Sequence, residues 1–207
     1  MDEARQVRDF WFGRQPFTAE TVNRRMQLWF GLGASDKLLQ QRDEFIRTKF
    51  GTLVDRAARG ELDAWADSPR RLLSLILLLD QFPRNIYRGT ARAFAQDQQA
   101  LALTLGGMQS GADAALDVVQ RIFFYMPLQH AESAEAQDES VAAYRRLLAE
   151  SPQELRNVFE SCVKYADLHR DVIRRFGRFP HRNRVLGRPS TAEEEAYLNS
   201  GGERFGQ

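Results

Sequence analysis

The stretch from Leu72 to Leu79 constrains the fold of this chain most, because it is apolar at every position except Ser74. On a helix these side chains point in all directions, so no polar face is left for water. Ser68 and Pro69 precede the stretch as a helix cap and a first-turn proline. We therefore predict a helix from Ser68 to Phe82-Pro83, buried at the centre of a helical protein.

Apolar residues recur with helical spacing along almost the whole chain, and no stretch shows a convincing strand pattern. Capping boxes begin at Ser151 and Thr191, and Gly60, Gly106-Gly107 and Gly177 are stop signals. The sequence predicts an all-α, tetratricopeptide-like array of about ten antiparallel-packed helices, with residues 1–207 as a single domain. The expected helices cover residues 4–12, 18–30, 35–60, 68–82, 90–105, 112–127, 135–149, 151–176 and 191–201.

Composition and charge exclude several classes of function. The net charge of +1 and the pI of about 7.9 give no overall field that favours nucleic acid or an anionic membrane. The longest apolar run is far shorter than the ~20 residues of a membrane span, and residues 1–5 lack the apolar core of a signal peptide. The single cysteine, Cys162, excludes an intramolecular disulfide framework and fits a reducing cytoplasm. We expect a cytoplasmic protein that takes no cofactor and no metal and has no nucleic-acid or membrane partner.

Two segments nearly repeat one another, and we call residues 80–89 the first corner and residues 178–188 the second corner. Each contains Phe-Pro, then Arg-Asn, then Gly. If the corners meet, their guanidinium and amide groups form a clamp for a phosphate or carboxylate; otherwise they cap helix C-terminal carbonyls. Asp80 ends the apolar helix, so we expect it to be at least partly buried beside a corner arginine. The candidate ligand-binding residues are Asp80, Arg84, Asn85, Arg88, Arg178, His181, Arg182 and Asn183.

The three histidines each lie beside other polar residues. His169 falls on the inward seam of the expected helix 151–176, close to Asp171, and His130 is followed by Glu132. An imidazole at such a place is either a hydrogen-bonded core residue or a general base with a pKa tuned near neutrality. The candidate catalytic residues are therefore His130, Glu132, His169 and Asp171.

Several segments together resemble a bacterial family known as the domain of unknown function number 924. They are residues 10–13, 77–89, 123–133 and 169–183, which contain the strings Asp-Gln-Phe-Pro-Arg-Asn and Arg-Phe-Pro-His-Arg-Asn. The resemblance covers nearly the whole chain. It implies an all-α, tetratricopeptide-like helical array, and it brings no reaction, substrate or catalytic residue with it.

Three functions remain open at this stage. The leading hypothesis is a binding protein whose pocket, lined by both corners, His130, Glu132 and His169, takes a small anion or an acidic peptide end. An enzyme of the hydrolase or lyase type would use His169 or His130 as base, oriented by Glu132 or Asp171, on a metabolite bearing phosphate or carboxylate. A scaffold or homodimer would instead expose an apolar patch; the sequence does not fix the oligomeric state. Corners on opposite sides of the molecule would exclude the first hypothesis.

Overall fold

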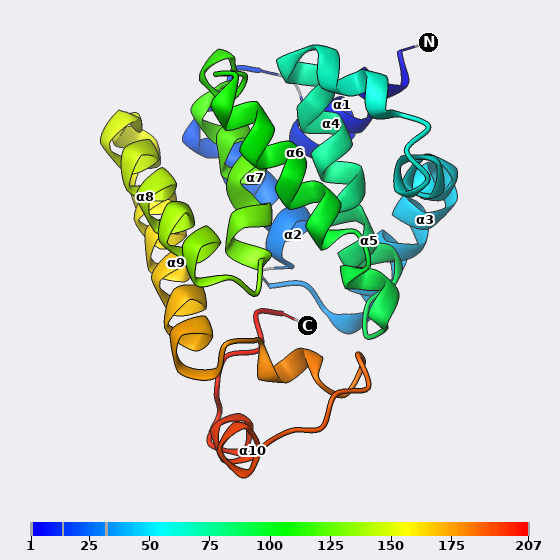
Figure 1. The fold of residues 1–207 in the computed structure, drawn as a ribbon. Helices are drawn as coiled ribbons and strands as arrows, with labels where there is room; N and C mark the ends of the chain where they lie inside the picture. The colour runs from blue at the N-terminus through cyan, green and yellow to red at the C-terminus, as the bar shows by residue number, and fades with distance from the viewer. Residues whose placement is uncertain (1, 14, 32, 207) are drawn as a thin grey trace.

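The computed structural model describes residues 2–13, 15–31 and 33–206, and in those ranges every regular element is a helix (Figure 1). The prediction of an all-α protein is therefore confirmed. Within the same ranges, no helix combines the length and apolar character that crossing a bilayer requires. The α-helices are α1 (Glu3–Phe12), α2 (Ala19–Phe30), α3 (Asp36–Ala58), α4 (Pro69–Leu79), α5 (Gln81–Ile86), α6 (Asp97–Gln109), α7 (Val118–His130), α8 (Ala134–Glu150), α9 (Arg156–Phe176) and α10 (Ala192–Asn199). Short 3-10 helices are η1 (Asp63–Asp67), η2 (Ala91–Phe94), η3 (Asp113–Ala115), η4 (Gln153–Leu155) and η5 (Pro180–Arg182).

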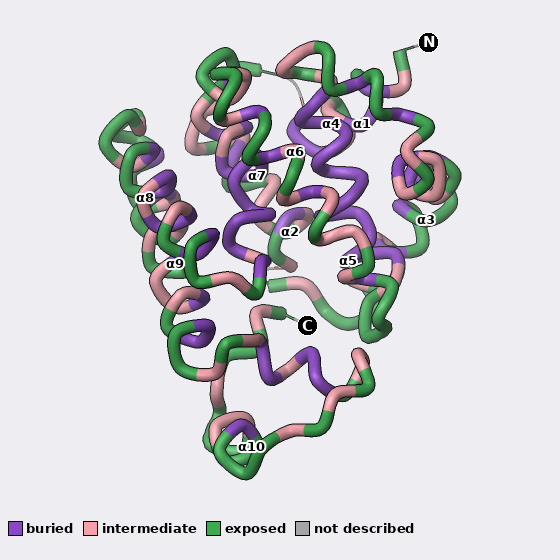
Figure 2. Tube along the Cα trace, in the orientation of Figure 1, coloured by how far each residue is buried: buried purple, intermediate pink, exposed green. Residues whose placement is uncertain are grey.

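Helix α4 lies at the centre, as its all-round apolar surface predicts. Every residue from Leu72 to Leu79 is buried (Figure 2), and α1, α3, α6 and α7 pack around the helix. The one polar residue of this stretch is fully hydrogen bonded: the Ser74 hydroxyl donates to the Ala4 carbonyl at 2.7 Å and accepts from Arg8 at 2.8 Å. Because each buried leucine contributes about 1.5–3 kcal/mol, α4 is a major source of hydrophobic stabilisation.

Helix α6 passes very close to α4 and α7 at Gly107. A Cβ atom there would lie 2.5 Å from the Phe124 ring and 2.8 Å from a Leu72 methyl group. The prediction that Gly106-Gly107 ends a helix is wrong, since α6 continues through both residues to Gln109. Glycine is needed here for close helix packing rather than for a turn.

Two prolines expected to end helices lie inside helices instead. The break after α4 comes at Asp80, which has φ −109° and ψ −58°, and Pro83 then lies in the first turn of α5. A missing N–H costs little in a first turn, because the amides there have no partner within the helix. Pro127 lies inside α7, which continues to His130. The predicted capping box at Ser151 is also wrong, since α9 begins only at Arg156, after η4.

Other end signals are confirmed. The Ser35 hydroxyl accepts from the Leu38 amide at the start of α3. Thr191 and Glu194 form the expected capping box of α10. Gly177 adopts a left-handed conformation, with φ 70°, and ends α9. These signals predict helix ends correctly because each one provides hydrogen bonds to unpaired backbone groups from residues only a few positions away.

Helices α7, α8 and α9 pack consecutively, with α8 and α9 forming one side of the molecule (Figure 1). The Gln137 amide of α8 donates to the carbonyls of Gln129 and Ala131, at 2.7 and 2.8 Å. Tyr144 likewise donates to the Ile122 carbonyl at 2.9 Å. The Gln137 bonds satisfy carbonyls at the C-terminal end of α7, which have no following helical amide as a partner. Helix α8 therefore fixes the position of the α7 terminus, where His130 lies.

The chain after α9 crosses beneath these helices, and its end returns toward the lower end of α7 (Figure 1). A small second core holds this region together. It comprises the buried residues Val172, Ile173 and Phe179, with Phe176, Tyr197 and Phe205 packed against them. This second core brings the second corner against the ends of α4 and α7.

Candidate functional site

Asp80 and His130 form a buried pair where α4 and α7 end. Asp80 is fully buried, and its Oδ1 lies 2.7 Å from His130 Nδ1 and 3.2 Å from the Arg84 guanidinium. Burial raises the pKa of Asp80, but the charge of Arg84 and the hydrogen bonds from His130 and Gln81 lower it by more, so the carboxyl is ionised. An ionised carboxylate only accepts hydrogen bonds, so His130 donates its Nδ1–H and keeps a lone pair on Nε2.

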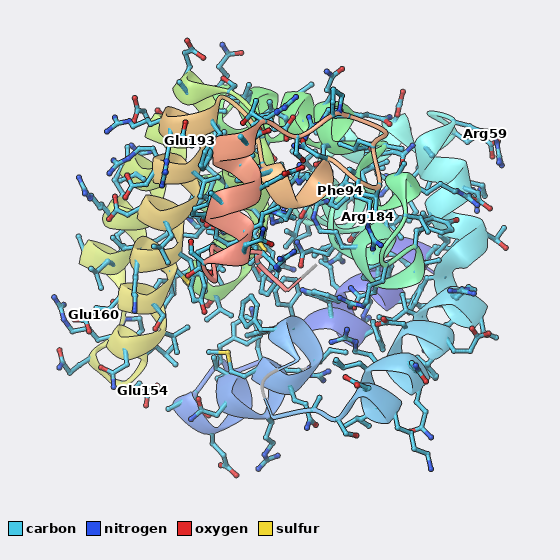
Figure 3. All side chains as sticks on the ribbon, turned by 90° about the horizontal axis from the view of Figure 1, so that it is seen from below. Arg59, Phe94, Glu154, Glu160, Arg184 and Glu193 are labelled. Atoms are coloured by element: carbon cyan, nitrogen blue, oxygen red, sulfur yellow. The ribbon has the colours of Figure 1, made fainter. Side chains whose placement is uncertain are left out.

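The two corners meet at Asp97, the first residue of α6. Arg84 of the first corner donates to both carboxylate oxygens of Asp97 at 2.8 Å. Arg182 of the second corner donates to Oδ2 of the same carboxylate at 3.1 Å and to the His130 carbonyl at 3.1 Å. The Phe94 ring lies beside both arginines, 5.5 Å from Arg84 Cζ and 4.5 Å from Arg182 Cζ. Figure 3 labels Phe94 and Arg184 where the second corner crosses the segment before α6.

The electrostatic balance of the two arginines differs. Arg84 contacts the carboxylates of Asp80 and Asp97, whose charges raise its pKa despite burial. Arg182 is only 6% exposed, and its Nε finds no hydrogen-bond partner among the described residues. Burial and then the charge of Arg84 lower the pKa of Arg182 to about 10. The positive charge of Arg182 is therefore compensated less completely than that of Arg84.

The three imidazoles gather beside this arginine. The ring centroids of His130 and His169 are 6.2 Å apart, and His169 and His181 both pack on Phe179, at 5.6 and 5.7 Å. His169 Nδ1 lies 2.7 Å from the Tyr165 carbonyl and so donates to it, which leaves a lone pair on Nε2. Neither ring nitrogen of His181 has a hydrogen-bond partner within the described part of the chain.

All three imidazoles are neutral in this environment. Burial, followed by the Arg84 charge, lowers the pKa of His130. Burial lowers the pKa of His169 well below its usual value, and His130 acts in the same direction. Burial and then the Arg182 charge lower the pKa of His181 to about 3. His181 is consequently the one imidazole of the three with an N–H that no other described residue accepts.

Phe205 covers two of these imidazoles, His169 and His181. Its ring stacks on His169 with 3.5 Å between centroids and 25° between planes, and it meets Phe179 and His181 edge-on at 5.8 and 5.7 Å. Two hollows of the described surface lie elsewhere, beside α9, where Asp171 contributes to their walls. Among the described residues, no group of three or more His, Cys, Asp or Glu side chains is arranged to hold a metal ion.

The remaining candidates hold the corners in place. Glu132 accepts the Phe179 amide at 2.8 Å and pairs with Arg188, so the carboxylate that orients His130 is Asp80 and not Glu132. Asp171 is exposed and lies two residues from His169 on α9, which places it on another side of the helix.

Four further candidates fasten the corners, either internally or to other parts of the fold. Arg178 and Asn183 both donate to Glu194, which fastens the second corner to α10. Asn85 donates to the Gln81 carbonyl, and Arg88 donates to Asp43 and to the Gly206 carbonyl. These residues build the frame of the site, while Asp80, Arg84, His130, His169, His181 and Arg182 form its polar centre.

Sequence reasoning missed Asp97 and Phe205. A pair of buried arginines requires carboxylate partners, but the chain holds 28 acidic residues, and nothing in the local sequence distinguishes Asp97 from the others. Phe205 lies in a polar, glycine-containing segment whose pattern predicts a loop. Each residue reaches the site only through the tertiary fold.

Comparison with known proteins supports the fold and supplies no activity. The family model described as "Bacterial protein of unknown function (DUF924)" matches residues 7–202. The solved structure of ATU0120, a protein of unknown function from Agrobacterium tumefaciens, is 35% identical with a TM-score of 0.76, and the match covers 96% of this chain and 97% of that one. No curated protein is significantly similar in sequence to this chain.

Proposed function

This chain belongs to the family of bacterial proteins of unknown function, DUF924, and from the geometry of its site we propose that the protein binds a small anion beside Arg182. The anion is a carboxylate or a phosphate, or the acidic end of a peptide. We assign this binding to the cytoplasm, because a single cysteine fits a reducing compartment. The tetratricopeptide-like arrangement also belongs to this proposal, and the consecutive packing of α7, α8 and α9 supports it.

The observation that carries the proposal is the incompletely compensated charge of Arg182. Arg182 pairs with Asp97, but Arg84 shares that carboxylate. The Nε of Arg182 has no acceptor among the described residues. A buried cation in this situation is costly unless an anion approaches it. A carboxylate or phosphate oxygen at Nε would form a charge-assisted hydrogen bond, which is stronger than a neutral one.

The imidazoles define how the anion would be held. His181 keeps a free N–H in either neutral tautomer, so it donates to the anion directly. His130 and His169 present lone pairs at Nε2, because their Nδ1–H groups are already engaged. Either ring can contact an anion through Nε2 only by taking up a proton. Binding should therefore be accompanied by proton uptake and should tighten as the pH falls toward 6.

The test uses inorganic phosphate and acetate as probes. With three histidines in the chain, long-range ¹H–¹⁵N spectra resolve six ring nitrogens and report tautomer and charge for each. Phosphate or acetate should shift the His181 nitrogens, and a probe at 100 times its Kd should add about 2.7 kcal/mol, or roughly 5–10 °C in Tm.

Two arginine variants provide the comparison. Arg182→Lys keeps the charge but loses the planar fork, so we expect weaker binding of the probe. Arg184→Lys is the matched control, because Arg184 is exposed and lies two residues away. The proposal is refuted if neither probe moves an imidazole resonance or the melting temperature, or if both variants bind the probe as the wild-type protein does.

A second candidate, a hydrolase or lyase, is favoured by one observation, the 2.7 Å contact between Asp80 and His130. An ionised aspartate that fixes the Nδ1–H tautomer leaves Nε2 as a general base. Arg182 would hold the phosphate or carboxylate of the substrate. If this candidate is correct, His130→Gln abolishes turnover of a chromogenic phosphate or carboxylate ester but leaves binding of its product. Turnover that survives in His130→Gln would exclude His130 as the base.

A further inference from the structure

Phe205 occupies a slot with three walls. The His169 ring forms its floor, and Phe179 and His181 form two sides. Phe205 lies almost face to face on the floor, with 3.5 Å between ring centroids, and makes the edge-on contact that aromatic rings favour with both sides. The slot therefore has the dimensions of a single aromatic ring.

The segment that carries Phe205, residues 203–206, is held by few contacts; we call it the closing segment. Its hydrogen bonds join the Glu203 amide to the Tyr197 hydroxyl and the Gly206 carbonyl to Arg88, while Arg204 reaches the Leu198 carbonyl. Glu203, Arg204 and Gly206 are exposed. Segments with few buried contacts open at low free energy, so the closing segment can leave the slot without unfolding the core.

The backbone at Phe205 is strained. Its φ of 50° lies in the left-handed region, and among the described residues it is the one non-glycine with a positive φ. A bulky side chain disfavours this conformation, which persists only where surrounding contacts hold it. Ring contacts with His169, Phe179 and His181 hold Phe205 in this conformation, and another ring in the slot would remove them.

The slot and the proposed anion site share Phe179. Its ring lies 5.8 Å from that of Phe205 and 4.4 Å from Arg182 Cζ. One small molecule with a ring and an acidic group a few bonds apart therefore spans both. We propose that the ligand is an aromatic or heteroaromatic acid whose ring replaces Phe205 on His169; this inference depends on the proposed anion site.

The proposal also assigns a role to the closing segment: it competes with the ligand for the slot. The free protein keeps the slot filled, and the ligand displaces Phe205 on binding. Removing the Phe205 ring should then strengthen binding of an aromatic acid. Since an aromatic pair is worth about 0.5–1.5 kcal/mol, we expect an affinity increase of about threefold to tenfold.

The experiment compares phenylacetate with cyclohexylacetate, which has similar size and charge but no aromatic ring. Each is titrated into the wild-type protein, Phe205→Ala and Glu203→Ala, a control in the same segment. We expect phenylacetate to bind Phe205→Ala more tightly than wild type, with little change in Glu203→Ala. Cyclohexylacetate should bind all three more weakly than phenylacetate does.

Two spectroscopic readings accompany the titration. Loss of the stacked ring in Phe205→Ala should move the His169 proton resonances downfield, and phenylacetate should move them back upfield. In the wild-type protein, phenylacetate should also accelerate hydrogen exchange at the Glu203 amide, whose partner is the Tyr197 hydroxyl.

The outcomes separate this proposal from the proposed function. If phenylacetate and cyclohexylacetate bind equally in every variant, and both still shift His181, the anion site stands and the aromatic ligand is refuted. If neither acid nor phosphate binds to any variant, the anion site is refuted and this proposal with it. Unchanged exchange at Glu203 with phenylacetate bound would refute displacement of the closing segment.

Discussion

Lowering the pH from 7.5 to 5.5 should reduce the free energy of unfolding by about 3–4 kcal/mol, because burial in the folded protein disfavours the charged form of all three histidines. Their pKa values are lowered by burial, for His181 to about 3, whereas an unfolded histidine titrates near 6.5. Below pH 6.5 the unfolded chain therefore binds protons that the folded protein does not. The stability is fully present above this pH and is lost as the pH falls.

The magnitude follows from the two pKa values. An imidazole that stays neutral when folded loses about 1.4 kcal/mol over these two pH units. His169 and His181 should each contribute this amount, and His130 at most the same. The sum is a large part of the 5–15 kcal/mol that stabilises an ordinary domain. Above pH 5.5, carboxyl groups contribute little, because their unfolded pKa values lie near 4.

Urea denaturation at half-unit pH steps measures this loss directly. The slope of the free energy of unfolding against pH should approach about 1.4 kcal/mol per pH unit for each proton that the chain takes up on unfolding. His181→Gln should reduce the slope by about 1.4 kcal/mol per pH unit, the contribution of one proton. A native ¹⁵N spectrum at pH 5.5 should show neutral imidazoles for His169 and His181. The reasoning would be refuted by a slope below about 1.4 kcal/mol per pH unit between pH 6.5 and 5.5, which corresponds to less than one proton. An imidazolium signal from His169 would also refute it.

Three further predictions concern packing and reactivity. Gly107→Ala should destabilise the protein by about 1–3 kcal/mol in urea denaturation, because its Cβ meets the Phe124 ring; Gly106→Ala, with open space around it, should not. Gln137→Leu should cost about 1–3 kcal/mol, since it leaves carbonyls at the end of α7 unpaired; an unchanged unfolding midpoint would contradict this role. Cys162 is partly exposed, but desolvation raises the pKa of its thiol to about 12, so labelling by a disulfide reagent at pH 8 should be slow until urea unfolds the chain.

The helical class was predictable because its signals are local. Apolar spacing, caps such as Ser35 and stops such as Gly177 act over one or two turns, and the structure follows them. Three of the failures share one cause. Pro83, Pro127 and Gly107 were given their local meaning as helix breakers, whereas tertiary packing or a position in a first turn makes each of them compatible with a helix.

The candidate site was predictable as a set of residue types but not as a geometry. The sequence indicated that Asp80 would be buried beside a corner arginine, and Arg84 lies 3.2 Å from it. It could not indicate that both corners share Asp97, or that Asp80 rather than Glu132 orients His130. The Asp80–His130 and Asp97–Arg182 pairings join residues 50 and 85 positions apart, and spacing along the chain carries no record of them.

The sharing of Asp97 has a consequence for the order in which the chain is made. While the ribosome is still synthesising α9, the nascent chain already contains Arg84, Asp97, Asp80 and His130, but not Arg182, which follows Asp97 by 85 residues. An early folding unit can therefore pair Arg84 with Asp97 and pack α4 among its neighbours. The guanidinium of Arg182 must then enter a partly assembled polar centre, followed by Phe205 as its cover. The polar centre can therefore be completed only after almost the whole chain has been made.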